Sequence, residues 1–144
     1  MNHLVFLDAR AGELEKILSG VKRMLVKDFD PHEPGAPSMA PGDSLYFLRD
    51  IDECDLRVGA KVVRVVPLVS GPDRDLAQAL KELQPGLQLD EVQYRYWSTR
   101  EQALLVEFES AHKIAVIRVA AEKVADRTRW IAFDDFRLMV EQSG

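Results

Sequence analysis

The chain has 144 residues, of which 47% are hydrophobic and 30% charged, and its formal net charge is −5. This length and composition are typical of one folded domain over 1–144 and exclude a disordered chain. The acidic balance means that any contact with nucleic acid depends on a local basic patch. A single cysteine, Cys54, excludes an intrachain disulfide and a Cys-x-x-Cys metal knuckle.

Two further observations concern location. No apolar run approaches the roughly 20 residues that a membrane span needs. The N-terminal residues 1–8 have neither a basic start nor a small-residue cleavage site, so we do not expect a signal peptide there. The sequence therefore favours a cytoplasmic protein without membrane contact.

The first third of the chain predicts strands around one short helix. Residues 4–7 are an apolar run typical of a strand. Residues 11–19 carry apolar side chains at i, i+3 and i+4 and predict a helix, with Gly20 at its C-terminal cap. A strand is expected at 24–26. The following residues 30–41 contain four prolines and predict a loop of unusual length.

The middle of the chain alternates between strand and helix patterns. Residues 44–49 are apolar on both faces and predict a central strand, and 61–68 are rich in β-branched residues. A helix is expected to begin at 70–73 and to stop at Pro85-Gly86. A second short helix is predicted over 90–96.

Three more strands are expected at 103–109, 114–119 and 130–133. Six or seven strands with two main helices indicate the α+β class. A mixed sheet of this size is expected to close into a small barrel, because closure removes exposed edges, with the two helices covering its ends.

A basic segment follows the first predicted helix. Four cations and no acid occur in twelve residues, Lys16, Lys22, Arg23 and Lys27. Beside a helix C-terminus and a turn, such a cluster is typical of a phosphate or carboxylate contact. The alternative is a solvated basic edge that pairs with the acidic residues after it.

The order of these elements resembles the ASCH branch of the PUA-like superfamily. Its pattern is Gly-x-Lys-x-x-Glu-x-Arg, or threonine in place of the glutamate; Gly20 and Lys22 match, and Lys27 stands at the arginine position. Leu25 replaces the glutamate or threonine, which is a departure. The segment 41–47, Pro-Gly-Asp-Ser-Leu-Tyr-Phe, matches the second signature.

A group of uncharacterised, mainly archaeal PUA-like proteins is more similar still. They share the Leu-Ser-Gly-x-Lys start, the Gly-Asp-x-Leu-Tyr-Phe strand, a leucine- and glutamine-rich segment before Trp97, and a late tryptophan, Trp130. The resemblance implies a PUA-like barrel with a cleft near Gly20–Lys22 that faces RNA or a modified nucleoside, without a cofactor.

On this interpretation the chain is a binding protein. Gly20 and Lys22 form the floor of the cleft and Lys27 holds an anion. Trp97 is expected to stack on a base, as the interleaving of aromatic residues and arginines near it suggests. The alternative is that Trp97 and Tyr94 pack under the barrel at a helix end. The expected ligand contacts are Gly20, Lys22, Arg23, Lys27, Trp97 and Arg100. No motif specific to DNA occurs, and the oligomeric state is not predicted.

Two alternatives remain at this point. One relative type in the ASCH branch acts on an acetylated cytidine with a lysine, a threonine and a glutamate. If this chain is an enzyme, an amidohydrolase with Lys22 and Glu101 is therefore expected, although Leu25 offers no hydroxyl. The other alternative is a protein-interaction module that uses the loop 31–41.

The remaining polar groups predict no metal site. The acidic residues of 50–55 lack the glycine and terminal glutamate of a calcium loop and indicate a solvated connection. The histidines at 3, 32 and 112 have no zinc-binding spacing, and His32 lies in the long loop near the motif. A second basic stretch, at 118–129, is expected to extend the first only if the fold brings the two together.

Overall fold

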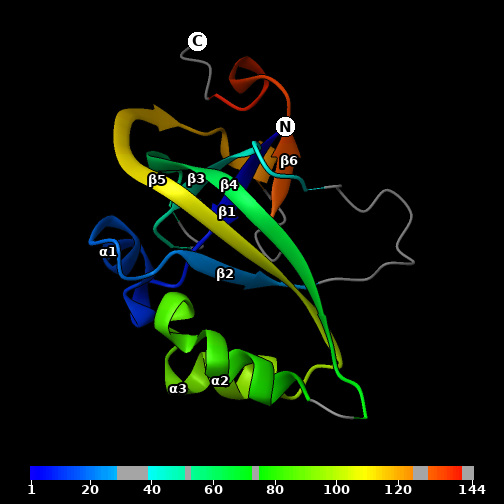
Figure 1. The fold of residues 1–144 in the computed structure, drawn as a ribbon. Helices are drawn as coiled ribbons and strands as arrows, with labels where there is room; N and C mark the ends of the chain where they lie inside the picture. Colours follow the sequence, from blue (N-terminus) through cyan, green and yellow to red (C-terminus); the bar gives the residue numbers. More distant parts are fainter. Residues whose placement is uncertain (29–38, 51–52, 73–74, 125–129, 141–144) are drawn as a thin grey trace.

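One mixed sheet organises the chain, as the computed structural model shows (Figure 1). The structure describes residues 1–28, 39–50, 53–72, 75–124 and 130–140. Within that part, six strands pair in the order β2-β5-β4-β3-β1-β6. Their bounds are β1 Asn2–Phe6, β2 Met24–Lys27, β3 Ser44–Leu48, β4 Asp55–Val69, β5 Gln102–Arg118 and β6 Ile131–Phe133.

The N-terminal strand lies inside the sheet. β1 pairs in parallel with β3, so that Leu4 lies opposite Tyr46, and in antiparallel with β6, so that Leu4 also lies opposite Ile131. A parallel pair needs a crossover connection. Here that connection contains α1 (Glu13–Leu18) and β2, and it ends in residues of which only part is described.

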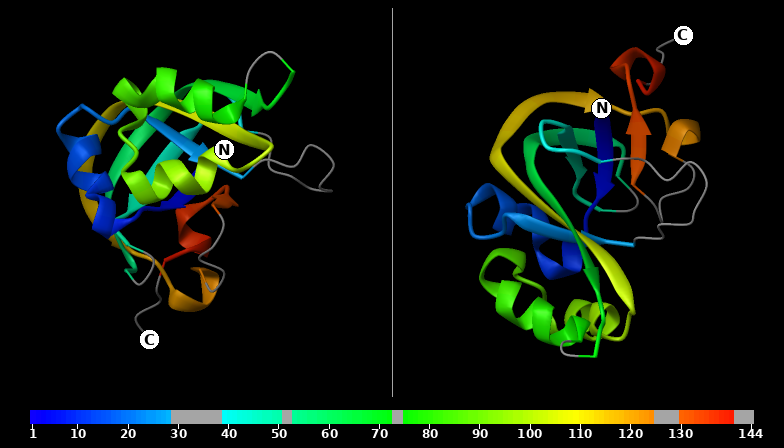
Figure 2. Two further views of the ribbon diagram at one scale, coloured as in Figure 1. Left: turned by 90° about the horizontal axis from the view of Figure 1, so that it is seen from below. Right: turned by 45° about the vertical axis from the view of Figure 1, so that its right-hand side comes forward.

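A long antiparallel pair of strands, β4 and β5, dominates the sheet. The two strands pair from Asp55 opposite Arg118 to Val69 opposite Gln102, and three register shifts bend them over the molecule (Figures 1 and 2). β2 lies on the other side of β5 and pairs only with its first part, Leu104 to Glu107. Beyond that point, within the described residues, β4 is the one named strand that pairs with β5.

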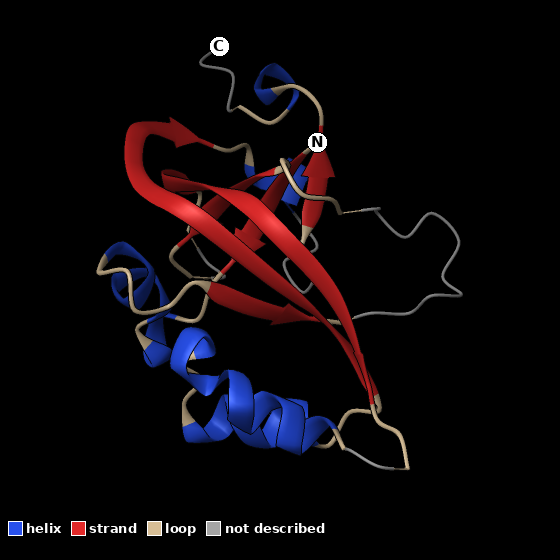
Figure 3. Cartoon of the chain, in the orientation of Figure 1, coloured by secondary structure: helices blue, strands red, loops and turns tan. Residues whose placement is uncertain are grey.

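The helices lie on one side of this strand pair. α2 (Leu76–Leu87) and α3 (Glu91–Ser98) connect the two strands and form a layer below β2 and the lower half of the pair, and α1 lies beside them (Figure 3). Leu80 and Leu87 of α2 pack with Met24 and Val26 of β2 in one buried cluster. A second cluster fills the concave side of the sheet around Phe47, Val106 and Phe108, and a third lies at its upper end.

The closed barrel is not confirmed. The sheet keeps two edge strands, β2 and β6. The three described α-helices correspond to those predicted over 11–19, from 70–73 to Pro85-Gly86, and over 90–96. The α+β class and the mixed sheet agree with the expectation.

Several predicted boundaries need correction. The strands expected at 103–109 and 114–119 are one strand, because β5 continues through Ser110 in a left-handed conformation (φ 58°). α2 begins after Asp75, whose carboxylate caps the Gln78 N–H. It continues past Pro85 and Gly86 and ends at Leu87, so these two residues do not stop the helix.

Three local predictions are confirmed. Gly20 follows α1 with φ 86°, a conformation that glycine adopts without strain, and its N–H donates to Ile17. The short helix after Asp90 is α3, which a capping box of Asp90 and Gln93 starts. β6 lies within the strand expected at 130–133. Residues 30–38 of the long loop lie outside the described residues.

Candidate functional site

The Lys22 side chain lies in the interior, where α1, α2 and β2 meet. Its Nζ is 3.4 Å from Glu13 Oε2 and donates a hydrogen bond to the Leu87 carbonyl. Glu13 in turn accepts the Asp8 N–H at 2.8 Å. Burial lowers the pKa of Lys22, and the Glu13 carboxylate opposes this effect. This burial does not agree with the expectation that the Lys22 side chain lies at the floor of a cleft open to a ligand.

The C-terminus of α2 explains why cations gather here. Its last carbonyls have no partner within the helix and carry the negative end of the helix dipole. The Gly86 carbonyl accepts the Arg23 N–H at 2.9 Å, and the Gln88 carbonyl accepts Lys16 Nζ at 3.3 Å. Together with Lys22, this part of the basic segment therefore caps a helix.

Lys27 belongs to a different surface, because side chains of a strand alternate between its faces. Met24 and Val26 face the helical layer, whereas Leu25 packs into the cluster on the concave side. Lys27 shares the face of Leu25, and its ammonium lies 5.3 Å from the centroid of the Trp130 ring. Trp130 is half-buried against the same cluster.

A histidine–aspartate pair, of which the histidine is buried, lies next to Lys27. His3 is only 1% exposed, and its Nε2 lies 2.9 Å from Asp43 Oδ2. Asp43 Oδ2 also accepts the Ala40 N–H at 3.1 Å. The charge of Lys27 acts on His3 and disfavours its protonation. We call Lys27, Trp130, His3 and Asp43 the Lys27 cluster.

The charges inside the Lys27 cluster follow from burial. Burial lowers the pKa of His3, and the hydrogen bond and charge of Asp43 oppose that effect. Burial alone raises the pKa of Asp43, but the hydrogen bonds from His3 and the Ala40 N–H outweigh it and hold the pKa below 3.8. A neutral imidazole thus donates to an ionised carboxylate at neutral pH.

This pair predicts a loss of stability in mild acid. The unfolded chain takes up a proton at His3 near pH 6.5, whereas the folded protein does so only at lower pH. Stability therefore falls as the pH drops below 6.5, by at most about 1.4 kcal/mol per pH unit from this group. Urea unfolding of wild type and His3→Gln between pH 7.5 and 5 measures it. Equal pH dependence in both proteins contradicts the prediction.

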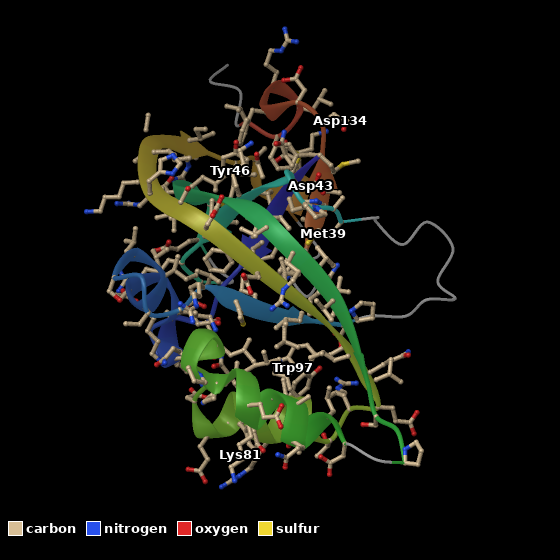
Figure 4. All side chains as sticks on the ribbon, viewed as in Figure 1. Met39, Asp43, Tyr46, Lys81, Trp97 and Asp134 are labelled. Atoms are coloured by element: carbon tan, nitrogen blue, oxygen red, sulfur yellow. The ribbon has the colours of Figure 1, made fainter. Side chains whose placement is uncertain are left out.

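Trp97 and Arg100 do not join the Lys27 cluster. Trp97 packs against the cluster of α2 and β2, with its ring edge on Tyr96 at 4.9 Å between centroids. The Arg100 guanidinium lies over the Tyr96 ring at 4.4 Å. Figure 4 shows Trp97 on the helical layer and Asp43 at the far side of the sheet. The prediction that Trp97 and Lys27 contribute to one ligand site is therefore wrong.

Lys22 and Glu101 are also apart. Glu101 is exposed, and its carbonyl accepts the Ser70 N–H where the chain enters α2. Lys22 contacts Leu87 at the other end of that helix, whose twelve residues span about 18 Å. The expected catalytic pair is not assembled. Gly20 and Arg23 are exposed near the Lys22 junction.

The described residues include a pocket but neither a metal-binding group nor a membrane-spanning helix. Among the described residues, no group of three or more His, Cys, Asp or Glu side chains has a metal-binding arrangement. None of the helices in that part has the length and apolar character needed to cross a membrane. A pocket of about 300 Å³ lies between β4 and α2, lined mainly by apolar side chains such as Val66, Leu76 and Leu83. His32, Arg127 and Arg129 lie outside the described residues.

Sequence reasoning missed the His3–Asp43 pair and the role of Trp130. The sequence pattern placed Asp43 in the segment 41–47 of the second signature and Trp130 in the strand expected at 130–133, and it assigned neither residue to a site. The alternation along Met24–Lys27 was the available signal, since it separates Lys27 from the residues that face the helices.

Comparison with known proteins bears on the fold. No family model and no curated protein matches the chain. Among solved structures, the ASCH protein of Zymomonas mobilis (ZmASCH) aligns with a TM-score of 0.60 at 16% identity, over 87% of this chain and 80% of that one. The chain has an ASCH-type fold.

Two mutant forms of ZmASCH give the same result. A tyrosine-to-phenylalanine mutant aligns with a TM-score of 0.62 at 16% identity, over 87% of this chain and 82% of that chain. A serine-to-alanine mutant aligns with a TM-score of 0.59 at 16% identity, over 81% and 73%. The ASCH-type architecture expected from the motifs agrees with these structures.

Proposed function

We propose that this protein binds RNA or a modified nucleoside, and that Lys27 and Trp130 make the principal contacts. The observation that carries the proposal is the position of the Lys27 ammonium, 5.3 Å from the centre of the Trp130 ring. Aromatic side chains stack on bases of any sequence, and a neighbouring cation meets the phosphate. The Lys27 cluster therefore offers a contact for the base and a contact for the phosphate of a nucleotide.

The residues that hold Lys27 and Trp130 in place support nucleotide binding here. His3 and Asp43 are hydrogen-bonded to each other and tie β1 to the start of β3. Trp130 rests on the same core cluster as Val5 of β1. A ring and an ammonium held on a hydrogen-bonded sheet lose little conformational freedom when they bind.

Intrinsic fluorescence tests the proposal directly, because the chain has two tryptophans. In Trp97→Phe the remaining emission comes from Trp130, and in Trp130→Phe it comes from Trp97. Cytidine monophosphate and a short single-stranded RNA serve as probes at low salt. We expect both ligands to quench Trp97→Phe with saturation and to leave the emission of Trp130→Phe unchanged.

The opposite pattern has a clear meaning. Saturable quenching in Trp130→Phe alone places the ligand on the α3 surface with Trp97, Tyr96 and Arg100. Absence of quenching by either probe in both variants contradicts nucleotide binding.

The predictions on relatedness, location and alternative functions bear on this proposal as follows. The relationship to a mainly archaeal PUA-like group and the cytoplasmic location remain predictions from the sequence. The hydrolase alternative has lost its catalytic pair, since Lys22 is buried against Glu13 and Leu87. The loop alternative concerns residues that are mostly outside the described part of the chain.

A further inference from the structure

His3 and the proposed ligand contacts share one face of the sheet. Ala132 of β6 lies opposite His3. Trp130 precedes Ala132 by two residues, and residues two apart along a strand lie on the same face. Trp130 also packs against the core cluster that contains Val5, two residues after His3. His3 and Trp130 are thus diagonal neighbours on the face where the Lys27 ammonium meets the Trp130 ring.

The surroundings of His3 hold charges of both signs. Asp43, in the turn before β3, has its Oδ2 2.9 Å from the imidazole Nε2. Lys27 at the end of β2 and the amino group of Met1 carry positive charge, and both disfavour protonation of His3. The residues opposite His3 on β3 and β6 do not titrate: they are Leu45 and Ala132. Of these groups, Lys27 is the one that a bound phosphate meets in the proposed function.

A bound phosphate changes the balance of these charges. In the free protein, the Lys27 ammonium repels a proton at His3. A phosphate that pairs with this ammonium offsets its charge, so that protonation of His3 becomes easier. Asp43 stays ionised in mild acid, because its pKa lies below 3.8, and its carboxylate then accepts a hydrogen bond from an imidazolium. Phosphate binding and proton uptake therefore favour each other.

Burial keeps this coupling strong. His3 is 1% exposed, and the Asp43 side chain is 12% exposed. Charges in such surroundings are screened less by salt than charges at the surface. His112 offers the contrast, because it is exposed and lies opposite Gly59 on a part of β5 beyond the residues that pair with β2. It therefore provides a matched control.

We propose that His3 takes up a proton from solvent when the phosphate of an RNA binds at Lys27, so that the protein binds RNA more tightly in mild acid than at neutral pH. This inference rests on the proposed function, since it concerns the regulation of the same Lys27 cluster. The proton and the phosphate each raise the affinity for the other by the same factor. Uptake of one proton limits the gain in affinity to about tenfold per pH unit.

Binding of a short oligouridylate at two pH values tests the proposal. Its phosphodiesters and bases do not titrate between pH 5.5 and 7.5, so that any pH dependence comes from the protein. Fluorescence anisotropy with a label insensitive to pH, at constant low ionic strength, measures the Kd. We expect the wild type to bind between about threefold and about tenfold more tightly at pH 5.5 than at pH 7.5.

Two histidine variants assign the effect. The amide of His3→Gln can still donate to Asp43 but cannot take up a proton in this range. We expect this variant to bind the oligouridylate with the same affinity at both pH values. His112→Gln removes an exposed histidine and should keep the pH dependence of the wild type.

Imidazole NMR of the wild type gives a second measurement that does not depend on a folded histidine variant. The titration midpoint of His3 is expected to rise when the protein is saturated with the oligouridylate, whereas the midpoint of His112 stays the same. Lys27→Met should raise the His3 midpoint in the free protein, because it removes the repelling charge.

Three outcomes overturn this inference and leave the proposed function standing. The first is binding of the oligouridylate to the wild type with equal affinity at the two pH values. The second is a pH dependence that persists in His3→Gln, and the third is a His3 midpoint that RNA binding does not move. Absence of binding at both pH values instead overturns the proposed function, and this inference with it.

Discussion

Replacing Glu13 by glutamine is expected to lower the free energy of unfolding by about 3 to 5 kcal/mol, because it leaves the buried Lys22 ammonium without its counter-charge. The Lys22 side chain has no exposed surface and that of Glu13 only 9%. The glutamine oxygen can still accept the Asp8 N–H, so the substitution isolates the charge. Urea unfolding at pH 7 measures the loss.

Two comparisons separate this effect from general damage to α1. Glu15, which lies on α1 with Glu13, forms an exposed ion pair with Arg49. Glu15→Gln removes this ion pair and should change the free energy of unfolding by less than about 0.5 kcal/mol. Burial lowers the pKa of Lys22 in the folded protein below the 10.5 of an ordinary lysine. As the pH rises toward 10.5, Lys22 therefore loses its proton in the folded protein before it does so in the unfolded chain, and the free energy of unfolding rises. The deficit of Glu13→Gln should therefore shrink at alkaline pH, and a deficit independent of pH would argue against a buried charge.

Replacing Trp130 by alanine is expected to weaken RNA binding between about fivefold and about a hundredfold, the usual range for loss of one base–aromatic stack. Lys27→Met should weaken binding and reduce the slope of affinity against salt by about one, because it removes a single phosphate contact. Fluorescence anisotropy of a labelled single-stranded RNA at several salt concentrations measures both effects.

The matched controls come from the helical layer. Lys81→Met removes an exposed cation of α2 and should leave the affinity and the salt slope unchanged. Arg100→Met removes the guanidinium over Tyr96, outside the Lys27 cluster. If Arg100→Met abolishes binding while Trp130→Ala does not, the ligand lies on α3 and the Lys27 cluster is not the site.

The existence of most strands could be predicted from the sequence, but the length of the paired strands β4 and β5 could not. The strands at 61–68 and 103–109 could be predicted because β-branched residues in the first and alternation in the second are local sequence patterns. The continuation of β5 breaks that alternation, because Ser110 adopts a left-handed conformation and the register shifts. A pattern based on period two cannot detect a strand that contains such irregularities.

The motif residues illustrate a second limit. Gly20 was correctly placed after α1, because its role depends on its neighbours in sequence. The burial of Lys22 depends on Glu13 and on the Leu87 carbonyl, 65 positions away along the chain. Whether a lysine of a basic segment meets solvent or a helix C-terminus is decided by tertiary packing, which periodicity does not encode.

The position of β1 has a consequence for how the chain folds. Its two neighbours are β3 and β6, and the pairing with β6 joins residues 2–4 to 131–133. That ladder cannot form until residue 133 has been synthesised. Contacts of such high sequence separation slow folding. We expect β6 to dock late, and the edge of β1 to be exposed to mispairing on the ribosome until it does.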